Sequence, residues 1–333
     1  MSNENFFTAI IVNYNGEELL IDCINSIVEA GIKPCHIIII DNGSKDNSIN
    51  KLKEHDLHCQ TTLLGCNAGF AKAVNIGLKQ VKTEFAVLIN NDASVTPNAF
   101  HEIKKSFKLH PKAAFIGGRL LNKDGSNQHS IAPFPRLLSE ICPGFIRRII
   151  SPKRFDNEFL TNQDIRVESV IGALFSIRMS ALNQIGLLDE DFFFFLEETE
   201  WCHRAAQLQW ETWHAPLAQA IHFQGATAKK YNALARIEYH RSRLTYYKKT
   251  SPNNYQLALS ILFLKAIINA TTNLAAVLIT LFMAPKLRKK TMVYCNILIW
   301  YLLGRPENIG LPDKCPAGIS PCTKVNNIYT NSK

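Results

Sequence analysis

Apolar runs alternate with amphipathic stretches through the first hundred residues, and this alternation constrains the fold more than any other feature. The runs predict four buried strands over residues 6–12, 35–40, 58–64 and 85–89. The residues between them predict helices over 17–30, from Asp46 onward and over 70–81, with Pro97 at the start of another. Such alternation is typical of a mainly parallel, doubly wound sheet, so we expect an α/β fold.

The second hundred residues are less regular. Strands are expected over 113–118, 167–177, 211–215 and 220–222. Residues 121–164 are irregular and proline-rich, with basic side chains at Arg136, Arg147, Arg148, Lys153 and Arg154. A long segment of this kind inside a compact domain is often a functional loop. We place one α/β domain over 1–248 and a basic, apolar helical region over 249–333.

Three polar clusters follow predicted strands at their carboxyl ends. They are Asn13–Asn15, Asp41–Ser44 and Asn90–Asp92. Ligands of doubly wound sheets bind at this edge, although these residue types also favour ordinary turns. No GxGxxG follows the first strand and no GxxxxGK[ST] occurs in the chain, so a dinucleotide site and a P-loop lose support. The three clusters together predict a nucleotide held by side chains.

The order of the motifs resembles family 2 glycosyltransferases, specifically their rhamnosyltransferase-like branch. The matching segments are IIVNYNGEELL, IIIIDNGSKDNS, GCNAGFAKAVNIGL, FAVLINNDASVTPNAF, VIGALFSIRMSALNQIGLLDEDFFFFLEETEWCHRA and IHFQGATA. They lie within residues 7–248. The resemblance implies a GT-A fold, a nucleotide-sugar donor, a divalent metal and an inverting transfer to a hydroxyl.

The resemblance also implies which residues hold the donor. Asp41 matches the acid that binds the base or ribose, although it could instead cap the helix near Asp46. The remaining candidates are Asn13, Asn15, Asn67, Gly69, Asn75, Asn90, Asn91 and Arg241. Asn15 suits a plain turn, Asn75 an exposed helix position, and Arg241 and Arg243 a solvated or membrane-facing basic surface. Gly69 also opens a helix, whose N-terminus favours a diphosphate.

The Asn90-Asn91-Asp92 sequence occupies the position of the family's DxD motif. Hard oxygen ligands there suit Mg²⁺ or Mn²⁺, with the donor diphosphate completing the coordination shell. Asn replaces the first acid, so Asp92 is the sole carboxylate of the motif. His222 matches a position that can supply an imidazole contact to the metal or phosphate. A satisfied polar residue at a strand end is an equal alternative for His222.

Glu197-Glu198 matches the family's acidic pair, whose second member is the general base. Adjacent helical residues point about 100° apart, so one of them can reach the acceptor hydroxyl. We assign the base to Glu198, with Glu197 orienting the acceptor or capping the helix. The apolar run Phe192–Phe195 is expected to raise the base's pKa. Three acids also suit a helix N-terminus without any catalytic role.

Two further expectations concern the surroundings of this acidic pair. Gly172 and Ala173, placed on a strand, match the small residues that admit the sugar. Glu200 and Arg204 are expected to form a surface ion pair, since they lie four residues apart on a helix.

The net charge of +9 is confined to the end of the chain. Residues 236–333 contain 14 basic and 3 acidic side chains, whereas residues 1–235 are nearly neutral. The apolar runs 266–285 and 291–304 flank the cationic stretch Lys286–Lys290, which we take as a connector. Polar residues at 269 and 271–273 disfavour a lone span. We rank helices lying in an anionic membrane interface first, a span second and a homodimer contact third. No nucleic-acid motif accompanies the charge.

The cysteines and the N-terminus bear on the compartment. Nine cysteines without CxxC pairs or regular spacing favour reduced, mostly buried thiols over disulfides or zinc. The first residues lack a secretory pattern. These observations predict the cytoplasmic face of the cell membrane, where the protein is peripheral or monotopic.

The sequence thus predicts an inverting, metal-dependent glycosyltransferase acting on a lipid-linked or glycan acceptor in surface-polysaccharide (O-antigen-like) assembly. The resemblance ranks dTDP-L-rhamnose first as donor and a UDP-sugar second. Because Asn stands at position 90, a non-catalytic nucleotide-sugar-binding scaffold is the alternative.

Overall fold

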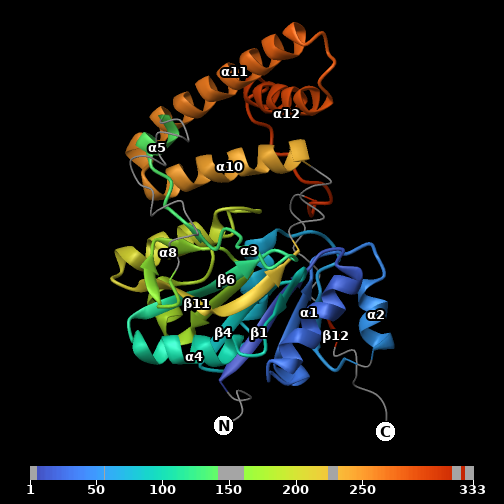
Figure 1. Ribbon diagram of the computed structural model, residues 1–333, viewed down its shortest axis with the longest axis vertical. Helices are drawn as coiled ribbons and strands as arrows, with labels where there is room; N and C mark the ends of the chain where they lie inside the picture. The colour runs from blue at the N-terminus through green and yellow to red at the C-terminus, as the bar shows by residue number, and fades with distance from the viewer. Residues whose placement is uncertain (1–5, 56, 142–160, 224–231, 317–323, 327–333) are drawn as a thin grey trace.

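The computed structural model describes residues 6–55, 57–141, 161–223, 232–316 and 324–326. A mixed sheet with helices on both faces forms the lower part of the molecule, and three further helices lie above it (Figure 1). The strands are β1 (Phe7–Asn13), β2 (Ile37–Asp41), β3 (Gln60–Leu63), β4 (Phe85–Asn90), β5 (Ala93–Val95), β6 (Ala113–Leu121), β7 (Ile131–Ala132), β8 (Ile165–Val167), β9 (Ser169–Val170), β10 (Leu174–Arg178), β11 (Glu211–His222) and β12 (Lys324–Asn326).

The main sheet has the strand order β12-β3-β2-β1-β4-β10-β6-β11-β5, and β8 also pairs with β11. Strands β1 to β4 are mutually parallel, and β6 is parallel to β11. Because β10 is antiparallel to both β4 and β6, the six strands β1–β4, β6 and β11 all run in one direction. The expected α/β, mainly parallel sheet is therefore confirmed.

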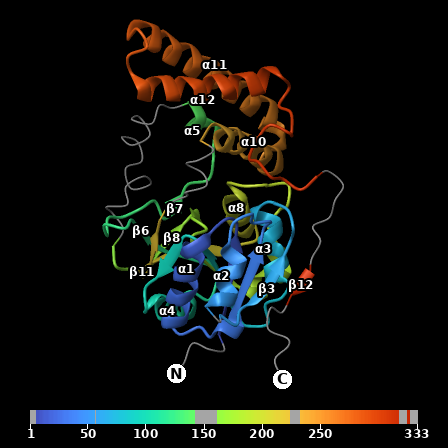
Figure 2. The same ribbon diagram turned by 90° about the vertical axis from the view of Figure 1, so that its right-hand side faces the viewer.

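The alternation of side chains along each strand creates a hydrophobic core on either face of the sheet. In β1, Ile11 packs into a core with Leu20 of α1, whereas Ile10 packs into the other core with Val74 of α3. Successive strand residues point to opposite faces, so both faces are apolar and need helices. The helices of this α/β layer are α1 (Glu17–Glu29), α2 (Ser48–Glu54), α3 (Phe70–Leu78), α4 (Ala99–Leu109), α7 (Leu182–Ile185) and α8 (Glu197–Gln207). The short helix α5 (Leu137–Ile141) lies away from the sheet, against α11 (Tyr255–Ile279) (Figures 1 and 2).

Two strand predictions need correction. The stretch 167–177 is not one strand, since Gly172 and Ala173 form the turn between β9 and β10. The stretches 211–215 and 220–222 are one strand, β11, whose pairing with β6 shifts register between Ala215 and Gln219. Such an irregularity bends the strand and keeps both halves in the sheet. Arg147, Arg148, Lys153 and Arg154 lie outside the described residues.

Three long helices form a separate layer above the carboxyl ends of the parallel strands (Figures 1 and 2). They are α10 (Asn232–Thr250), α11 (Tyr255–Ile279) and α12 (Pro285–Leu302). Leu262 and Trp300 are fully buried in their common core. Lys286–Lys290 is not a connector but the beginning of α12, because Pro285 starts that helix. The actual connector is the short turn 280–284.

Helix α10 lies between the sheet layer and the hairpin formed by α11 and α12. Ser242 of α10 donates a hydrogen bond to the carbonyl of Phe194 at 2.7 Å. Glu140 of α5 is buried and forms ion pairs with Arg243 of α10 and Lys265 of α11. The first contact fixes the helical layer against the loop that precedes α8, and the two ion pairs join α5 to α10 and α11.

The expectation that all nine cysteines are reduced is wrong for two of them. Cys66 and Cys315 form a disulfide between positions 249 residues apart. The segment containing Cys315 returns to the sheet, where its amide donates to the Asn67 carbonyl at 2.9 Å. Of the unpaired cysteines in the described part of the chain, Cys23, Cys59 and Cys202 are buried, Cys295 is half-buried and Cys35 is exposed.

Candidate functional site

The side chains of Asn13 and Asp41 meet at the carboxyl ends of neighbouring strands β1 and β2. The two residues are register partners, and the Asn13 amide donates to Asp41 Oδ1 at 3.0 Å. Asn91, which follows β4, donates to Asn13 Oδ1 at 2.9 Å. The three predicted polar clusters therefore join in one hydrogen-bonded network. Helix α2 begins at Ser48 with Asn47 as its cap, so Asp41 is not a helix cap.

Asn15 and Asp41 both anchor the turn that follows β2. The Ser44 amide donates to Asp41 Oδ2 at 3.1 Å, and the Lys45 amide donates to Asn15 Oδ1 at 2.8 Å. Asn15 adopts a left-handed backbone (φ 55°), a region that asparagine tolerates. The Asn15 side chain therefore stabilises a turn, which was one of the two roles that the sequence allowed for it.

Asn67 and Gly69 form the wall beside this network. Asn67 Oδ1 accepts from the Gly69 amide at 3.1 Å and from the Asn42 amide group at 2.9 Å. Gly69 precedes α3 with φ 90°, and a Cβ there would come within 2.9 Å of Phe193. Glycine is therefore required where the N-terminus of α3 meets the loop before α8.

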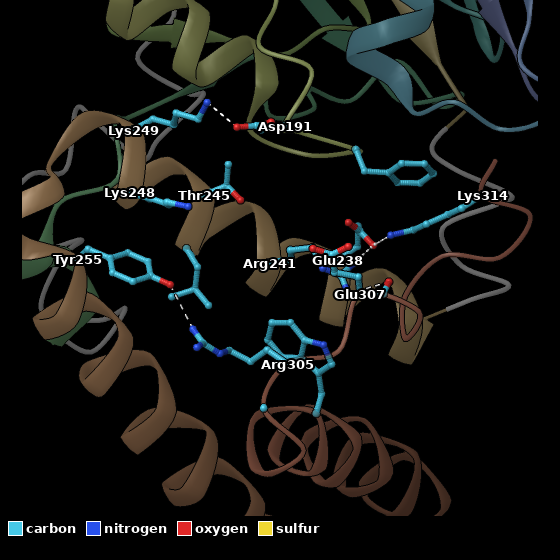
Figure 3. Close-up of a pocket in the computed structure, with 14 residues that line it drawn as sticks. Asp191, Glu238, Arg241, Thr245, Lys248, Lys249, Tyr255, Arg305, Glu307 and Lys314 are labelled. Carbon is cyan, nitrogen blue, oxygen red and sulfur yellow. Dashed lines mark hydrogen bonds and ion pairs between the residues drawn. The ribbon is translucent and has the colours of Figure 1, made fainter. Parts of the chain in front are cut away.

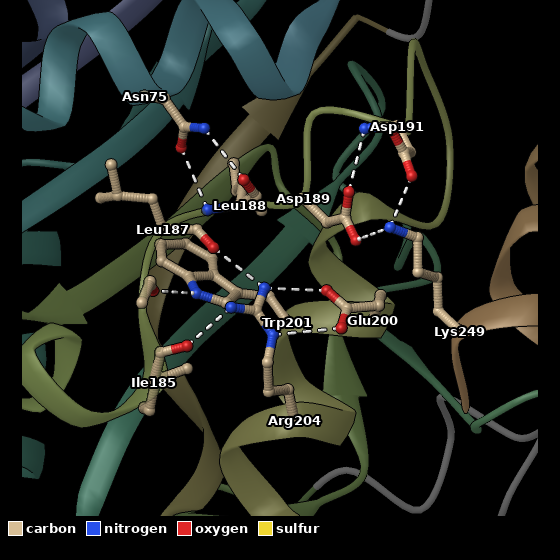
Figure 4. Close-up of polar contacts among 11 residues, drawn as sticks. Asn75, Ile185, Leu187, Leu188, Asp189, Asp191, Glu200, Trp201, Arg204 and Lys249 are labelled. Atoms are coloured by element: carbon tan, nitrogen blue, oxygen red, sulfur yellow. Dashed lines mark hydrogen bonds and ion pairs between the residues drawn. The ribbon is translucent and has the colours of Figure 1, made fainter.

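Asn75 is not an exposed helix residue; its exposed fraction is 2%. Its amide donates to the Leu188 carbonyl at 2.9 Å and accepts from the Leu188 amide at 3.0 Å (Figure 4). Asn75 thus fixes the loop between α7 and α8 by a two-way hydrogen bond. Asn75 is buried because it lies on the face of α3 that packs inward.

Asp92 and His222 approach each other next to the end of β4. His222 Nε2 lies 3.3 Å from Asp92 Oδ1 and 3.3 Å from Asn90 Nδ2. Gln128 determines which ring nitrogen holds the proton. Its amide nitrogen donates to Asn122 Oδ1 and to the main-chain carbonyl of His222, so its Oε1 is left to accept from His222 Nδ1 at 3.1 Å. In this tautomer Nε2 is an acceptor, and it faces both the Asn90 amide group and the Asp92 carboxylate.

This pair fits a divalent cation. An imidazole lone pair and a carboxylate oxygen 3.3 Å apart repel each other unless a cation or proton lies between them. A carboxylate and a neutral imidazole are suitable ligands for Mn²⁺, and a nucleotide diphosphate can complete the shell. No group of three or more His, Cys, Asp or Glu residues in the described part of the chain could hold a metal by itself.

The carboxylate of Glu198 lies against Gly172, in the turn between β9 and β10. A Cβ at Gly172 would come within 2.0 Å of Glu198 Oε1. The next residue, Ala173, accepts a hydrogen bond from the Asn90 amide at 3.4 Å. Glu198 is therefore held beside the Asn90–Asp92 segment.

Burial raises the pKa of Glu198 to about 7. Burial also raises the pKa of Glu197 well above its usual value, and the charges of Glu198 and Glu238 add to this effect. Phe195 and Leu196 enter α8 with φ of 74° and 67°. Two consecutive left-handed residues are a strained entry into a helix, and such strain is concentrated at functional sites.

Glu200 and Arg204 do form an ion pair, at 2.9 Å, but Glu200 is buried rather than on the surface. Arg204 also donates to the carbonyls of Ile185 and Leu187 (Figure 4). The pair therefore connects α8 to the segment that Asn75 also holds. Arg241 lies apart from the strand-edge network, in α10, where it pairs with Glu238 and donates to the Pro306 carbonyl.

The comparison of this sequence with known protein families gives a match to Glycosyl transferase family 2 over residues 8–186. This match covers more than half of the chain. The chain belongs to glycosyl transferase family 2.

Curated relatives and solved structures agree with this assignment. This chain is 21% identical over 252 residues to N-acetylglucosaminyl-diphospho-decaprenol L-rhamnosyltransferase of Mycobacterium tuberculosis. The aligned region covers 70% of this chain and 81% of the relative. The crystal structure of GalNAc-T7 with UDP, GalNAc and Mn²⁺ matches 75% of this chain at 16% identity with a TM-score of 0.51. This chain spans about half (52%) of that protein.

A mannosyltransferase from Pyrobaculum calidifontis, solved in complex with GDP-Man and Mn²⁺, matches over a greater length. The match covers 92% of this chain and 88% of the mannosyltransferase, at 13% identity and a TM-score of 0.50. The two structural matches establish that the family 2 glycosyltransferase has the GT-A fold.

Sequence reasoning missed two features of the site. Gln128 lies in the irregular segment 121–164, where no periodicity marks it. Asp313 accepts a hydrogen bond from the Tyr14 hydroxyl at 2.7 Å and forms an ion pair with Lys45. The segment 313–315 therefore lies at the rim of the network. Because Asp313 is 299 residues away from Tyr14 in the sequence, no local pattern predicts this contact.

Proposed function

We propose that this chain is an inverting, metal-dependent glycosyltransferase that transfers L-rhamnose from dTDP-L-rhamnose to a lipid-linked or glycan acceptor. The proposal places it in surface-polysaccharide (O-antigen-like) biosynthesis. The position of Glu198 is the observation that carries it: a carboxylate with a pKa of about 7, beside Gly172 and the Asn90–Asp92 segment. The L-rhamnosyltransferase relative supports the choice of sugar.

In the proposed reaction, Glu198 accepts the proton of the acceptor hydroxyl. The hydroxyl oxygen then attacks the anomeric carbon on the face opposite the leaving nucleoside diphosphate, so the configuration inverts. A base is most effective when its pKa is near the working pH, and burial brings Glu198 into that range. Burial and the charge of Glu198 raise the pKa of Glu197 and so favour its protonated form, which can donate a hydrogen bond to the acceptor.

The donor is bound by the network at the strand edge. We assign Asp41 and Asn13 to the nucleoside, with Asn15, Asn67 and Gly69 as the wall of its pocket. Asn90 and Asn91 are further proposed donor contacts, whereas the side chains of Asn75 and Arg241 are engaged with Leu188 and Glu238. Gly69 also places the N-terminus of α3 toward this edge, where it favours a diphosphate.

Asp92 and His222 are the proposed metal ligands, with Gln128 holding the imidazole in the coordinating tautomer. A divalent cation held there, Mn²⁺ or Mg²⁺, would neutralise the charge that develops on the leaving diphosphate. Mn²⁺ occurs in both structures of similar fold.

The helical layer is proposed to hold the enzyme at the cytoplasmic face of the membrane. One helix of the described chain, Pro252–Ile279, is long and apolar enough to cross a membrane. The hydroxyls of Thr271 and Thr272 are bonded to carbonyls of the preceding turn, so they lose little in an apolar setting. The turn after α11 exposes Leu281 and Met283, whose exposed fractions are 77% and 82%. An apolar turn followed by Lys286–Lys290 suits the interface of an anionic membrane.

The test is donor turnover by the purified chain with Mn²⁺ and a panel of dTDP-L-rhamnose, UDP-N-acetylglucosamine and GDP-mannose. Release of dTDP from dTDP-L-rhamnose above the other two supports the proposal. Glu198→Gln should abolish release by at least a hundredfold while dTDP still binds. Preference for the UDP-sugar would replace the donor assignment, and binding without any turnover would indicate the non-catalytic scaffold.

A further inference from the structure

A cavity of about 570 Å³ lies between the loop before α8 and the three helices of the upper layer (Figure 3). Its volume is within the usual range of small-molecule sites. Phe193, which packs against Gly69, lines one end, and so does Lys314, whose neighbour Asp313 binds Tyr14. Glu238 also lines it, and the charge of Glu238 acts on Glu197. The cavity therefore adjoins both the donor network and the acidic pair.

The cations of this cavity fall into two groups. At the end near Phe193, Arg241 and Lys314 are both paired with the fully buried Glu238. Lys249, at the rim, is paired with Asp189 and Asp191. These three cations are neutralised by carboxylates of the chain itself.

Arg305 and Lys248 form the second group, and neither has a carboxylate partner among the described residues. Arg305 Nη1 donates to the Tyr255 hydroxyl at 3.2 Å, and the hydroxyl of Thr245 lines the same part of the cavity (Figure 3). The acid Glu307 also lines the cavity, and its charge acts on Lys314. One part of the cavity thus combines two uncompensated cations with two hydroxyls.

The backbone holds Arg305 in this position at a cost. Gly304 and Arg305 have φ of 79° and 65°, so the chain reverses directly after α12 through two left-handed residues. Glycine accepts this conformation freely, but arginine rarely adopts it. The residue held in this uncommon conformation is thus a cation without a carboxylate partner among the described residues.

Exposed apolar side chains lie close in sequence to Arg305 and to Tyr255. Leu302 and Leu303 precede Arg305, and Leu257 follows Tyr255; all three are more than half exposed. They continue the exposed apolar surface of α11 and α12. A ligand that matches both parts has an anionic head and a long apolar chain.

We propose that this cavity binds the phosphate or diphosphate head of an amphiphile through Arg305 and Lys248, with its apolar chain along α11 and α12. A guanidinium binds phosphate oxygens in a bidentate manner, and the hydroxyls of Thr245 and Tyr255 can add donors. The amphiphile is the lipid-linked acceptor, an assignment that rests on the proposed function. The phosphate head would then lie in the cavity that adjoins the acidic pair through Glu238.

Binding to the full chain, measured by isothermal titration without any donor, tests this inference. The probes are farnesyl diphosphate below its micelle concentration, farnesol, inorganic pyrophosphate and dTDP. Farnesyl diphosphate is expected to bind more tightly than farnesol or pyrophosphate. Arg305→Gln should weaken it at least tenfold, Lys248→Gln several-fold, and Arg305→Lys to an intermediate degree, because an ammonium lacks the planar fork. The matched control is Arg288→Gln, an exposed cation of α12 outside the cavity, which should change it less than twofold.

Other results would overturn the inference. Equal effects of Arg305→Gln and Arg288→Gln would exclude the site, and equal binding of pyrophosphate would mean a free-anion site. Loss of dTDP affinity in parallel would assign Arg305 to the donor diphosphate. Selective loss of binding to phosphatidylglycerol vesicles in Arg305→Gln would assign the site to bulk lipid. If Arg305→Gln does not fold, the loss of farnesyl diphosphate affinity in Lys248→Gln, a change on the exposed surface of α10, tests the same site. Binding that depends on Arg305 in a protein without donor turnover would keep the site and remove the proposed function.

Discussion

His222 Nε2 faces Asp92 Oδ1 at 3.3 Å, while the opposite ring nitrogen donates to Gln128. The hydrogen bond to Gln128 therefore fixes the orientation of the imidazole. Its other nitrogen, Nε2, faces Asp92, the only acid of the Asn90–Asp92 segment. This arrangement connects a residue of the irregular segment to the proposed metal site through one hydrogen bond.

Gln128→Leu is expected to weaken Mn²⁺ binding by about 10- to 100-fold, because the imidazole loses the acceptor that selects its tautomer. Mn²⁺ affinity is measured by electron paramagnetic resonance in the presence of dTDP. Gln207→Leu, at an exposed position of α8, serves as the matched control and should leave the affinity unchanged. An unchanged affinity in Gln128→Leu would remove Gln128 from the metal site, whereas Asp92→Asn should abolish binding.

The activity should depend on pH through Glu198. The base must be ionised, and burial raises its pKa to about 7, so the protonated, inactive form predominates below that pH. We expect kcat/KM to rise about tenfold per pH unit up to about pH 7 and then to level off. Glu198→Gln should leave a residual rate without this rise, while Glu54→Gln on the exposed end of α2 should keep the full profile. A rate independent of pH between 5 and 8 would contradict the assignment.

Gly172→Ala is expected to lower kcat by roughly 100-fold without unfolding the protein. The added methyl group would overlap Glu198 Oε1, and the carboxylate, as the end of a flexible side chain, can move away. A displacement of about 1 Å at a reacting group costs about this factor. The melting temperature and the dTDP affinity should stay close to wild type, since neither depends on that carboxylate. A large loss of stability with full specific activity of the folded fraction would argue for a packing role instead.

Reduction of the Cys66–Cys315 disulfide should weaken nucleotide binding. The bond holds the segment in which Asp313 contacts Tyr14 and Lys45 at the rim of the donor network. Cys315→Ser should lower the free energy of unfolding by about 2 to 5 kcal/mol, because the bond closes a very long loop. Urea denaturation and dTDP titration measure the two effects. Cys35→Ser, at an exposed unpaired thiol, should show neither, and an insensitivity of Cys315→Ser would make the bond irrelevant to the site.

The turn after α11 should carry membrane binding. Replacing Leu281, Phe282 and Met283 together by serine removes three exposed apolar side chains and should reduce sedimentation with anionic vesicles by at least tenfold. Donor hydrolysis in solution should remain, because the turn lies far above the sheet (Figure 1). Leu109→Ser, an exposed apolar position of the α/β layer, controls for surface hydrophobicity. Undiminished sedimentation of the triple variant would locate the contact elsewhere.

The sequence predicts those parts of the molecule that local patterns determine. The apolar runs locate β1, β2 and β4, and the polar residues after them meet because parallel strands end at one edge. Asn13, Asp41 and Asn91 are accordingly found in one network. The pairing of Glu198 with Gly172 is less visible, since a β-turn brings together a helix and a strand pair that no pattern relates.

Contacts across long stretches of sequence account for what was missed. The cysteines at 66 and 315 lie too far apart for spacing to suggest a bond. Lys286–Lys290 resembles a connector because it is charged, but Pro285 starts a helix at that point. Asn75 is a polar residue that faces inward, and its burial depends on Leu188, which reaches it from another element.

The pairing of β12 with β3 has a consequence for how the protein is made. Strand β3 receives its antiparallel neighbour from residues 324–326, and Cys66 receives its partner from residue 315. On the ribosome, both apolar helices α11 and α12 are synthesised before either of these segments. Domains generally fold as they emerge, but here the edge of the sheet stays open until translation has passed the membrane-seeking hairpin. The nucleotide-binding half can therefore be completed only after that hairpin has had the opportunity to engage a lipid surface.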